Sequence, residues 1–143
     1  MLQPIPYLAF DGQCAEAMRF YARTLGGKLG MLTNGQSPFA DQCPPEHLDR
    51  VMHARLELDG GAFLYGGDCP PHIPYQGIHG VSLTLNYDTI EQAEQVFNAL
   101  AEGGQVTMPF ADTFWAKKFG MLTDRFGCNW IVNGELADMD LES

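Results

Sequence analysis

Polar side chains able to do acid–base chemistry alternate along one short segment of the chain. His53, Arg55 and Glu57 are separated by apolar residues between 51 and 59, and a period of two is typical of a strand with one buried face. The polar face of such a strand either meets solvent, which is common, or lines a cavity. In a cavity these side chains could fix the polar groups of a ligand or act as acid and base. They are our candidate catalytic residues.

Aromatic rings gather in a second segment, residues 110–120, which the sequence predicts as a loop that runs into a strand at 119. Large rings on a loop either fold back over the core or wall a pocket for an apolar ligand. Polar residues are interleaved with these rings, and a further ring follows in a predicted strand. The candidate ligand-binding residues are Asp112, Phe114, Trp115, Phe119 and Trp130, with Lys117 as a second possible polar anchor.

Metal binding has two possible sources in this sequence. His53 and His79 lie on or at the start of predicted strands, and first-row divalent ions bind imidazole together with carboxylate. The second source is a pair of proline-rich loops that contains Cys43, His47, Cys69 and His72. Tetrahedral zinc accepts two thiolates and two imidazoles, but proline-rich loops often carry such residues by coincidence, and we favour coincidence here.

These candidates belong to a pattern that the chain carries twice. Five positions of the first copy, Asp11, Phe20, Ala22, Gly26 and Gly27, recur 77 residues later as Asp88, Phe97, Ala99, Gly103 and Gly104. Each copy predicts a strand, a helix, a glycine stop and a second strand. Two such copies tend to pair their sheets about a pseudo-two-fold axis, and we expect a pocket in the crease between them.

The first copy, residues 1–66, is predicted to follow the order βαβββ. Its strands are expected at 5–10, 28–33, 51–59 and 62–65, and its helix at 13–25. Residues 34–49 are rich in Pro, Gly, Gln and Asp and show no periodicity. They predict a long loop, which is either a lid over a site or a poorly ordered segment.

The second copy, residues 78–135, is predicted to repeat the order βαβββ. Its strands are expected at 80–87, 105–108, 119–123 and 129–133. Its helix begins at Asp88 or Thr89, because Thr89 followed by Gln92 is a capping-box pattern. Residues 67–77 link the two modules, and residues 1–143 form a single domain.

Composition limits the function classes. The formal net charge of −10 repels phosphate backbones, so nucleic acid is not an expected partner. No segment approaches the length of an apolar membrane span and no signal peptide is recognisable, so we expect a cytoplasmic protein without a membrane partner. The four cysteines lack a C-x-x-C spacing and are expected to be reduced. Nucleotide-binding fingerprints are absent from the sequence.

The chain resembles the PhnB-like branch of the glyoxalase/bleomycin resistance superfamily, also called vicinal oxygen chelate proteins. The similarity spans nearly the whole chain and is carried by short motifs at residues 7–12, 17–21, 99–104, 112–116 and 123–127. It implies an α+β fold in which two βαβββ modules form a cupped, mixed eight-stranded sheet. It also implies a frequent homodimer whose cavity in many relatives holds a divalent metal.

The metal ligands of these relatives are not carried over to this chain. Such relatives place His, Gln or Glu on the first and last strands of each module. Here the first strand has residues 4–7 and the last has Trp130 to Asn133 at those places, none of which is a usual ligand. Only His79 lies where a relative's histidine would, so the implied metal set is incomplete.

Three functions remain open. The first is a metal-independent protein that binds a small molecule of unknown identity, without the standard four-ligand metal site. The second is a metal-dependent lyase, isomerase or dioxygenase of the glyoxalase type. The third is a dimeric, antibiotic-sequestering resistance protein, whose acidic charge suits a cationic drug. A cofactor is either absent or a divalent metal, and whether the chain is an enzyme stays open.

Overall fold

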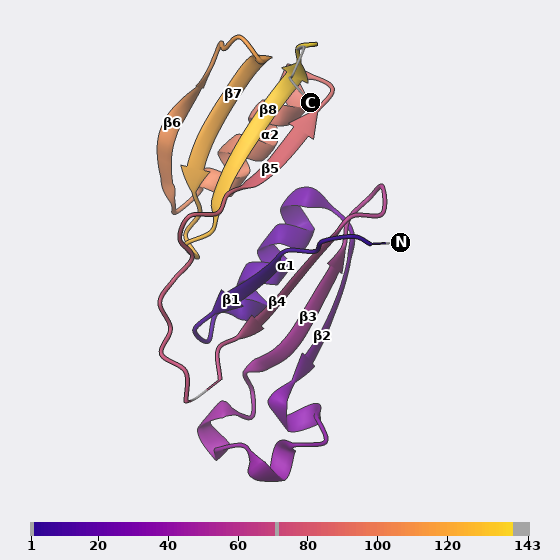
Figure 1. Ribbon diagram of the computed structural model, residues 1–143, viewed down its shortest axis with the longest axis vertical. Helices are drawn as coiled ribbons and strands as arrows, with labels where there is room; N and C mark the ends of the chain where they lie inside the picture. The colour runs from indigo at the N-terminus through magenta and orange to yellow at the C-terminus, as the bar shows by residue number, and fades with distance from the viewer. Residues whose placement is uncertain (1, 71, 139–143) are drawn as a thin grey trace. The chain divides into compact units, whose positions relative to one another are not determined.

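The computed structural model describes residues 2–70 and 72–138, which form eight strands and two helices (Figure 1). The chain divides between Gly77 and Ile78 into two compact units, and each is described by itself. Each unit has one helix and one four-stranded sheet, in the order βαβββ. The α+β class and the repeated module predicted from the sequence are therefore confirmed. The eight strands form two four-stranded mixed sheets, one in each unit.

The first unit builds its sheet in the order β1-β4-β3-β2. Its elements are β1 (Tyr7–Phe10), α1 (Cys14–Leu25), β2 (Lys28–Thr33), β3 (Val51–Glu57) and β4 (Phe63–Asp68). Strands β1 and β4 run parallel, and the other neighbours are antiparallel. The first strand of the unit therefore lies beside the last.

The second unit repeats this arrangement in the order β5-β8-β7-β6. Its elements are β5 (Leu83–Tyr87), α2 (Ile90–Ala101), β6 (Gln105–Ala111), β7 (Ala116–Thr123) and β8 (Asn129–Leu136). Strand β5 is parallel to β8, and the other pairs are antiparallel. The same strand order in both units agrees with the duplicated sequence.

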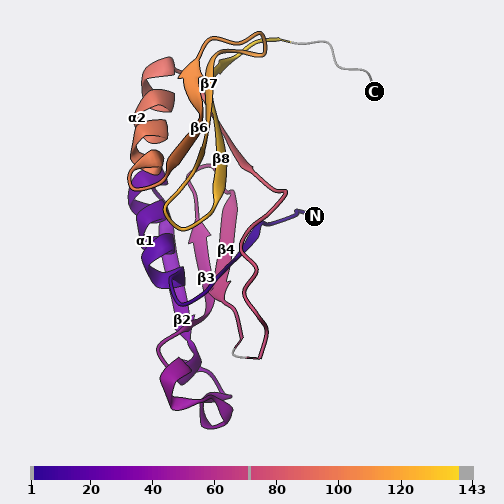
Figure 2. The same cartoon turned by 90° about the vertical axis from the view of Figure 1, so that its left-hand side faces the viewer.

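In each unit the helix covers one face of the sheet and leaves the other face open (Figure 2). Helix α1 buries an apolar stripe that includes Ala17, Phe20 and Tyr21 against the side of β3 that carries Ala54 and Leu56. Burial of this stripe is the main contribution to the stability of such a two-layer unit. The alternation along β3 thus fixes which of its side chains lie on the open face.

The glycine pairs end both helices as the sequence predicts, and they also permit close packing. Gly26 and Gly103 adopt positive φ angles of 82° and 75° at the helix ends. A Cβ atom at Gly27 would collide with the carbonyl oxygen of Glu57, and one at Gly104 with that of Thr123. Each helix–strand connection therefore passes against the end of a neighbouring strand, where only glycine fits.

The two helices begin with different caps. Thr89 caps α2, and its hydroxyl accepts a hydrogen bond from the backbone N–H of Gln92 at 3.2 Å, as the capping-box pattern predicts. Gln13 offers no side-chain cap to α1. Instead Asp68, at the end of β4, accepts hydrogen bonds from the backbone N–H groups of Gly12 and Cys14 at 2.9 and 3.0 Å.

The segment between β2 and β3 is a built loop with short helical turns. Three 3-10 turns occupy Asn34–Gln36, Ala40–Gln42 and Pro45–His47. The base of the loop is closed by backbone hydrogen bonds from Asn34 to Arg50 and from Gly35 to Leu48, each of 2.9 Å. The two ends of the predicted long loop are therefore tied together.

The loop predicted over residues 110–120 is shorter in the structure. Strand β6 continues to Ala111 and β7 already begins at Ala116, so only residues 112–115 connect the two strands. The register of β6 against β7 shifts twice, and Pro109 cannot donate a backbone hydrogen bond within the strand. For these reasons the sequence pattern predicted an end of the strand at 108 instead of 111. None of the helices in the described parts of the chain is long and apolar enough to cross a membrane.

Candidate functional site

The open face of the first sheet carries the predicted residues His53, Arg55 and Glu57. They alternate on β3 with the buried residues Ala54 and Leu56, which lie under α1. Pairing of the strands places three further rings on the same face, Tyr7 of β1 and Phe63 and Tyr65 of β4. We call these six residues the first open face.

Aromatic contacts join the rings of the first open face into a row. The His53 ring stacks on Tyr7, with centroids 5.9 Å apart, and meets the edge of Tyr65 at 4.9 Å. Tyr65 in turn contacts Phe63 at 6.2 Å. Such pairs contribute roughly 0.5–1.5 kcal/mol beyond their burial. The row is thus a fixed surface of rings on a sheet face that α1 does not cover.

Tyr7 is held at one end of this row. Its hydroxyl donates a hydrogen bond to the carbonyl oxygen of Met52 at 3.3 Å, and it passes over Gly67, where a Cβ atom would lie only 2.6 Å from the hydroxyl oxygen. Partial burial raises the pKa of the Tyr7 hydroxyl above its ordinary value of 10.0, and the Cys14 thiol adds to this shift. The phenol therefore stays protonated and acts as a donor at neutral pH.

Arg55 forms the cationic end of the row. The central carbon of its guanidinium lies 4.7 Å from the centroid of the Phe63 ring, a cation–π contact. Its cross-strand neighbours are Tyr65 on one side and Gly30 on the other. Among residues 2–70 and 72–138, no carboxylate lies within salt-bridge distance of Arg55. The guanidinium therefore has unused donors.

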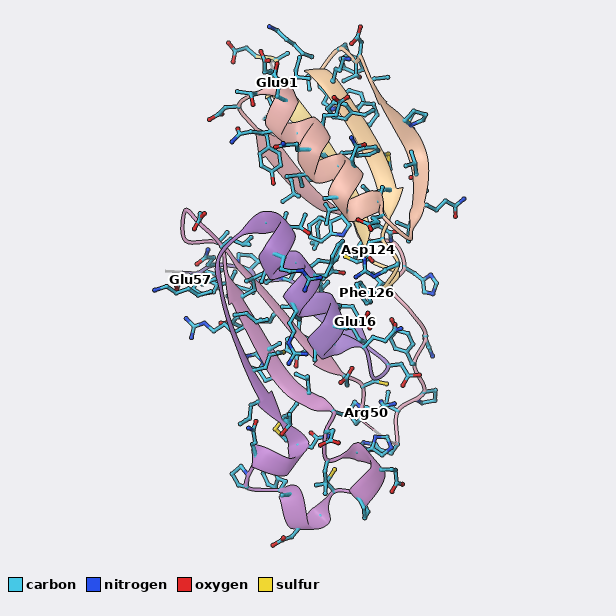
Figure 3. All side chains as sticks on the ribbon, turned by 180° about the vertical axis from the view of Figure 1, so that it is seen from behind. Glu16, Arg50, Glu57, Glu91, Asp124 and Phe126 are labelled. Carbon is cyan, nitrogen blue, oxygen red and sulfur yellow. The ribbon has the colours of Figure 1, made fainter. Side chains whose placement is uncertain are left out.

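Glu57 ends the strand beyond Arg55 and is exposed (Figure 3). Its cross-strand neighbours are Lys28 of β2 and Phe63 of β4. Arg55 and Lys28 outnumber Glu57, so the fixed charge of this part of the sheet is positive although the whole chain is acidic. This arrangement can bind a planar anion or polarise a polar group, while the rings pack against an apolar body.

The open face of the second sheet holds another part of the predicted set. Trp115 packs on Phe119 with centroids 4.4 Å apart, and Phe114 meets Trp115 at 4.9 Å. The indole N–H of Trp115 donates to Oδ1 of Asn133 at 3.1 Å, and Nδ2 of Asn133 donates to Oδ1 of Asn86 at 3.0 Å. Both open faces therefore combine held aromatic rings with polar groups.

Polar residues at the edge of this second face behave differently. Lys117 forms an ion pair of 3.0 Å with Glu135, so its charge is already matched. Asp112 lies exposed in the connection between β6 and β7. Within the described residues Asp112 makes no hydrogen bond or ion pair. Its role as a polar anchor therefore stays a prediction.

Trp130 is separated from the other candidate rings by the sheet itself. It alternates with Ile131 and pairs with Leu122 on the side of the sheet that α2 covers, and its exposure is only 1%. Its indole N–H donates to Oδ2 of Asp124 at 2.8 Å, while Oδ1 of that carboxylate accepts from backbone N–H groups of the turn after β7 (Figure 3). Trp130 therefore packs in the core of the second unit, and its role in ligand binding stays a prediction.

The residues that the structure describes do not fit the divalent metal centre that the family resemblance implies. His79 is exposed and precedes β5, and His53 is surrounded by aromatic rings. Within residues 2–70 and 72–138, no group of three or more His, Cys, Asp and Glu side chains could hold a metal ion.

A hollow of about 500 Å³ lies in the first unit between the 34–49 loop and the chain after β4. It contains two members of the suspected zinc set, Cys43 and His72, with walls that include Phe39, Met52 and Pro70. Part of its polar lining is already engaged. The Asp68 carboxylate accepts three backbone N–H groups, and the Asn34 amide donates to a backbone carbonyl at 3.0 Å.

Three rings of the first open face were not among the candidate site residues predicted from the sequence. Tyr7, Phe63 and Tyr65 lie in short apolar runs that read as buried strands. The alternation that separates Phe63 and Tyr65 from the buried residues Leu64 and Gly66 appears only in the structure, because residues 63–67 of this strand are apolar throughout. Their meeting with His53 depends on strand register, which no local pattern reveals.

Comparison with known proteins identifies close relatives. A family model described as 3-demethylubiquinone-9 3-methyltransferase matches residues 3–133. The crystal structure of protein PA1353 from Pseudomonas aeruginosa shares 51% identity, with 94% of this chain and 98% of that chain covered and a TM-score of 0.87.

Two further solved structures share this fold at lower sequence identity. A PhnB protein from Bacillus cereus, also described by the methyltransferase name, is 25% identical over 93% of this chain and 99% of its own, with a TM-score of 0.74. A glyoxylase/bleomycin resistance protein/dioxygenase domain from Frankia sp. EAN1pec is 13% identical. Its TM-score is 0.64 over 96% of this chain and 98% of that chain, which shows a shared fold.

Proposed function

Since the chain belongs to the family described as 3-demethylubiquinone-9 3-methyltransferase, the PhnB-like branch of the glyoxalase/bleomycin resistance superfamily, we propose that it is a small-molecule-binding protein. The ligand packs on the rings of an open sheet face and is oriented by polar side chains beside them. Binding needs no four-ligand metal centre. Methyl transfer is not part of this proposal, since the sequence has no glycine-rich turn for a nucleoside cofactor.

One observation carries the proposal: the first open face combines a fixed row of aromatic rings with a guanidinium that has no acidic partner among the described residues. Ligand sites in proteins are typically apolar surfaces with a few well-placed polar groups. His53 and Arg55 supply those groups, with Glu57 at the edge. The rings Trp115 and Phe119 with Asn133 form a comparable surface in the second unit.

A homodimer belongs to the same proposal. Strand β6 is an edge strand of its sheet and is exposed along most of its length, with Val106 and Met108 presenting large apolar side chains. Exposed apolar edge strands are surfaces that proteins tend to cover. Light scattering coupled to size-exclusion chromatography measures the mass directly, and a mass of one chain at all concentrations would reject the dimer.

A fragment library tests the binding proposal. Ligands that bind the folded state raise its melting temperature. We expect aromatic hits for the wild-type chain, and we expect the shift to shrink for His53→Ala or Trp115→Ala, according to the face that a hit occupies. Amide and side-chain chemical shifts measured by NMR locate each hit.

Leu2→Ala is the matched control for these replacements, because Leu2 is an apolar side chain with 97% exposure and touches neither face. It should leave every hit unchanged. A library without hits, or hits that respond to neither His53→Ala nor Trp115→Ala, would reject the proposed function.

Metal loading tests whether the chain binds a divalent metal ion, which the proposal does not require. Because no three donor side chains converge among the described residues, purified protein loaded with zinc, nickel, manganese or iron(II) should lose the ion on dialysis. Elemental analysis of the dialysed protein is the measurement. Retention near one equivalent per chain for any of these ions would restore the metal-dependent alternative.

A further inference from the structure

We propose that the first open face selects planar carboxylates, that is, aromatic or conjugated carboxylic acids. The carboxylate pairs with the guanidinium of Arg55 and the ring of the ligand packs against Tyr65. This inference rests on the proposed function and names the substrate class of that site.

The guanidinium of Arg55 on β3 lies over the ring of Phe63 on β4. A guanidinium centred 4.7 Å from a ring centroid has one face covered, while the N–H groups around its rim stay available. A carboxylate matches two of these N–H groups in one plane, which a point-like cation such as Lys does not offer. The stacked arrangement therefore favours a flat, two-oxygen acceptor.

Space for such an acceptor lies beside Arg55 on β2. Its cross-strand neighbour there is Gly30, and a Cβ atom built at Gly30 would meet no other atom within 4 Å. The opposite neighbour is Tyr65, whose ring already meets the edge of His53. An anion held by Arg55 can therefore lie beside the rings of Phe63 and Tyr65 on β4, and the open space above Gly30 leaves its approach from β2 unobstructed.

The charge of the side chains at this site favours the binding of anions over cations. Arg55 has no ion pair among the described residues, in contrast to Arg50 and Lys117, whose charges are matched by Asp11 and Glu135. Glu57 is the nearest acidic residue along β3, and among the described residues it forms no ion pair with Arg55; its register neighbour on β2 is Lys28. In a chain with a net charge of −10, this unmatched guanidinium is a local site for a carboxylate.

A matched set of small probes tests the inference. Benzoate is compared with its neutral amide benzamide, with the planar cation benzamidinium and with the non-aromatic acid cyclohexanecarboxylate. We expect benzoate to bind the wild-type chain about tenfold or more tightly than benzamide, as a charge-assisted pair predicts. Titration followed by NMR, including the Nε–Hε signal of Arg55, gives the affinity and the place of binding.

Variants of Arg55 distinguish the effect of its planar guanidinium on binding from the effect of positive charge alone. Arg55→Gln should remove the preference for benzoate over benzamide, and Arg55→Lys should restore little of it because the planar fork is lost. Arg19→Gln, an exposed residue on α1 and thus away from this face, is the control and should keep the preference.

The outcomes distinguish this inference from the function on which it rests. Equal binding of benzoate and benzamide, or a preference that survives Arg55→Gln, would overturn the carboxylate assignment and leave small-molecule binding intact. Equal binding of benzoate and cyclohexanecarboxylate would overturn the stacking of the ligand ring. Absence of binding by all four probes would overturn the assignment, and a library without hits would reject the proposed function as well.

Discussion

Asp68 connects three segments of the first unit with one side chain. Its Oδ1 accepts hydrogen bonds from Gly12 and Cys14 at the start of α1, and its Oδ2 accepts one from the backbone N–H of Val51 at 2.8 Å. A carboxylate at this place also interacts favourably with the positive end of the helix dipole. The residue is therefore an anchor for the strand that carries His53 and Arg55.

Replacement of Asp68 by Asn should destabilise the chain. An amide has one acceptor oxygen, so its NH₂ group must face the N–H groups of α1 or that of Val51. The loss of hydrogen bonds to a charged acceptor predicts a decrease of about 2 kcal/mol in the free energy of unfolding. Urea denaturation followed by circular dichroism measures it.

Asp41→Asn is the control for this replacement, since Asp41 is exposed in a short 3-10 turn. It should change the stability by less than about 0.5 kcal/mol. A similar effect of both replacements would show that Asp68 contributes only general charge.

Cys14 predicts a pH dependence of stability. The thiol is fully buried, and burial, followed by the charge of Asp68, raises its pKa from 9.0 to about 12. Between these two values the unfolded chain loses the thiol proton while the folded chain keeps it. The free energy of unfolding should therefore be unaffected by this group below about pH 9 and fall as pH rises toward about 12.

Denaturation curves between pH 8 and pH 10 measure this slope, and Cys14→Ala is the reference. The upper limit is chosen because the pKa values of Tyr7 and Tyr87 are also raised, from 10.0, and affect the stability at higher pH. The wild-type slope should exceed that of the variant. Parallel curves would contradict a buried, protonated thiol.

At the scale of elements, two glycines of the first sheet have opposite surroundings. A Cβ atom at Gly67 of β4 would lie 2.6 Å from the Tyr7 hydroxyl oxygen and 2.9 Å from the Met52 carbonyl oxygen. One at Gly30 of β2 would meet nothing within 4 Å. Strand β4 thus leaves room for Tyr7 to cross it, and β2 leaves room for a ligand.

Gly67→Ala should therefore displace Tyr7, while Gly30→Ala should be tolerated. We expect a loss of about 1–3 kcal/mol for Gly67→Ala, as for other overpacked sites, and little change or a small gain for Gly30→Ala. Nuclear Overhauser contacts between Tyr7 and His53 report the displacement directly. Their survival in Gly67→Ala would show that the ring does not depend on this passage.

Local patterns predicted much of the element structure. The alternation around His53 gave β3 and its open face, and Thr89 with Gln92 gave the start of α2. The contact between Arg55 and Phe63 was out of reach, because it depends on the register of β3 against β4. The side of the sheet on which Trp130 lies could not be predicted, because its neighbour Ile131 is also apolar and the sequence shows no alternation there.

At the scale of the whole molecule, the duplication repeats its packing more closely than its chemistry. The helix stops of both units meet the end of a neighbouring strand in the same way, through Gly27 at Glu57 and Gly104 at Thr123. The open faces differ, with Arg55 and its rings in one unit and an Asn133-held indole in the other.

Equivalent replacements at the two stops should have similar effects. Gly27→Ala and Gly104→Ala each force a side chain onto a backbone carbonyl oxygen, so both should lower the free energy of unfolding by at least about 2 kcal/mol. Gly27→Ala should cost more, because its φ of 118° adds backbone strain. Urea denaturation of both variants is the measurement.

Gly60→Ala separates strain from collision, because Gly60 has a φ of 90° but open space where a Cβ atom would lie. It should cost about 1–2 kcal/mol from strain alone. A loss at Gly104 no larger than that at Gly60 would contradict the close approach of the two segments.

Alternation along β3 has a practical consequence for engineering. Ala54 and Leu56 belong to the packed layer, while the residues between them point to the opposite side of the strand. Under the proposed function, the ligand preference can be altered at positions 53, 55 and 57 without changing the packed side chains Ala54 and Leu56.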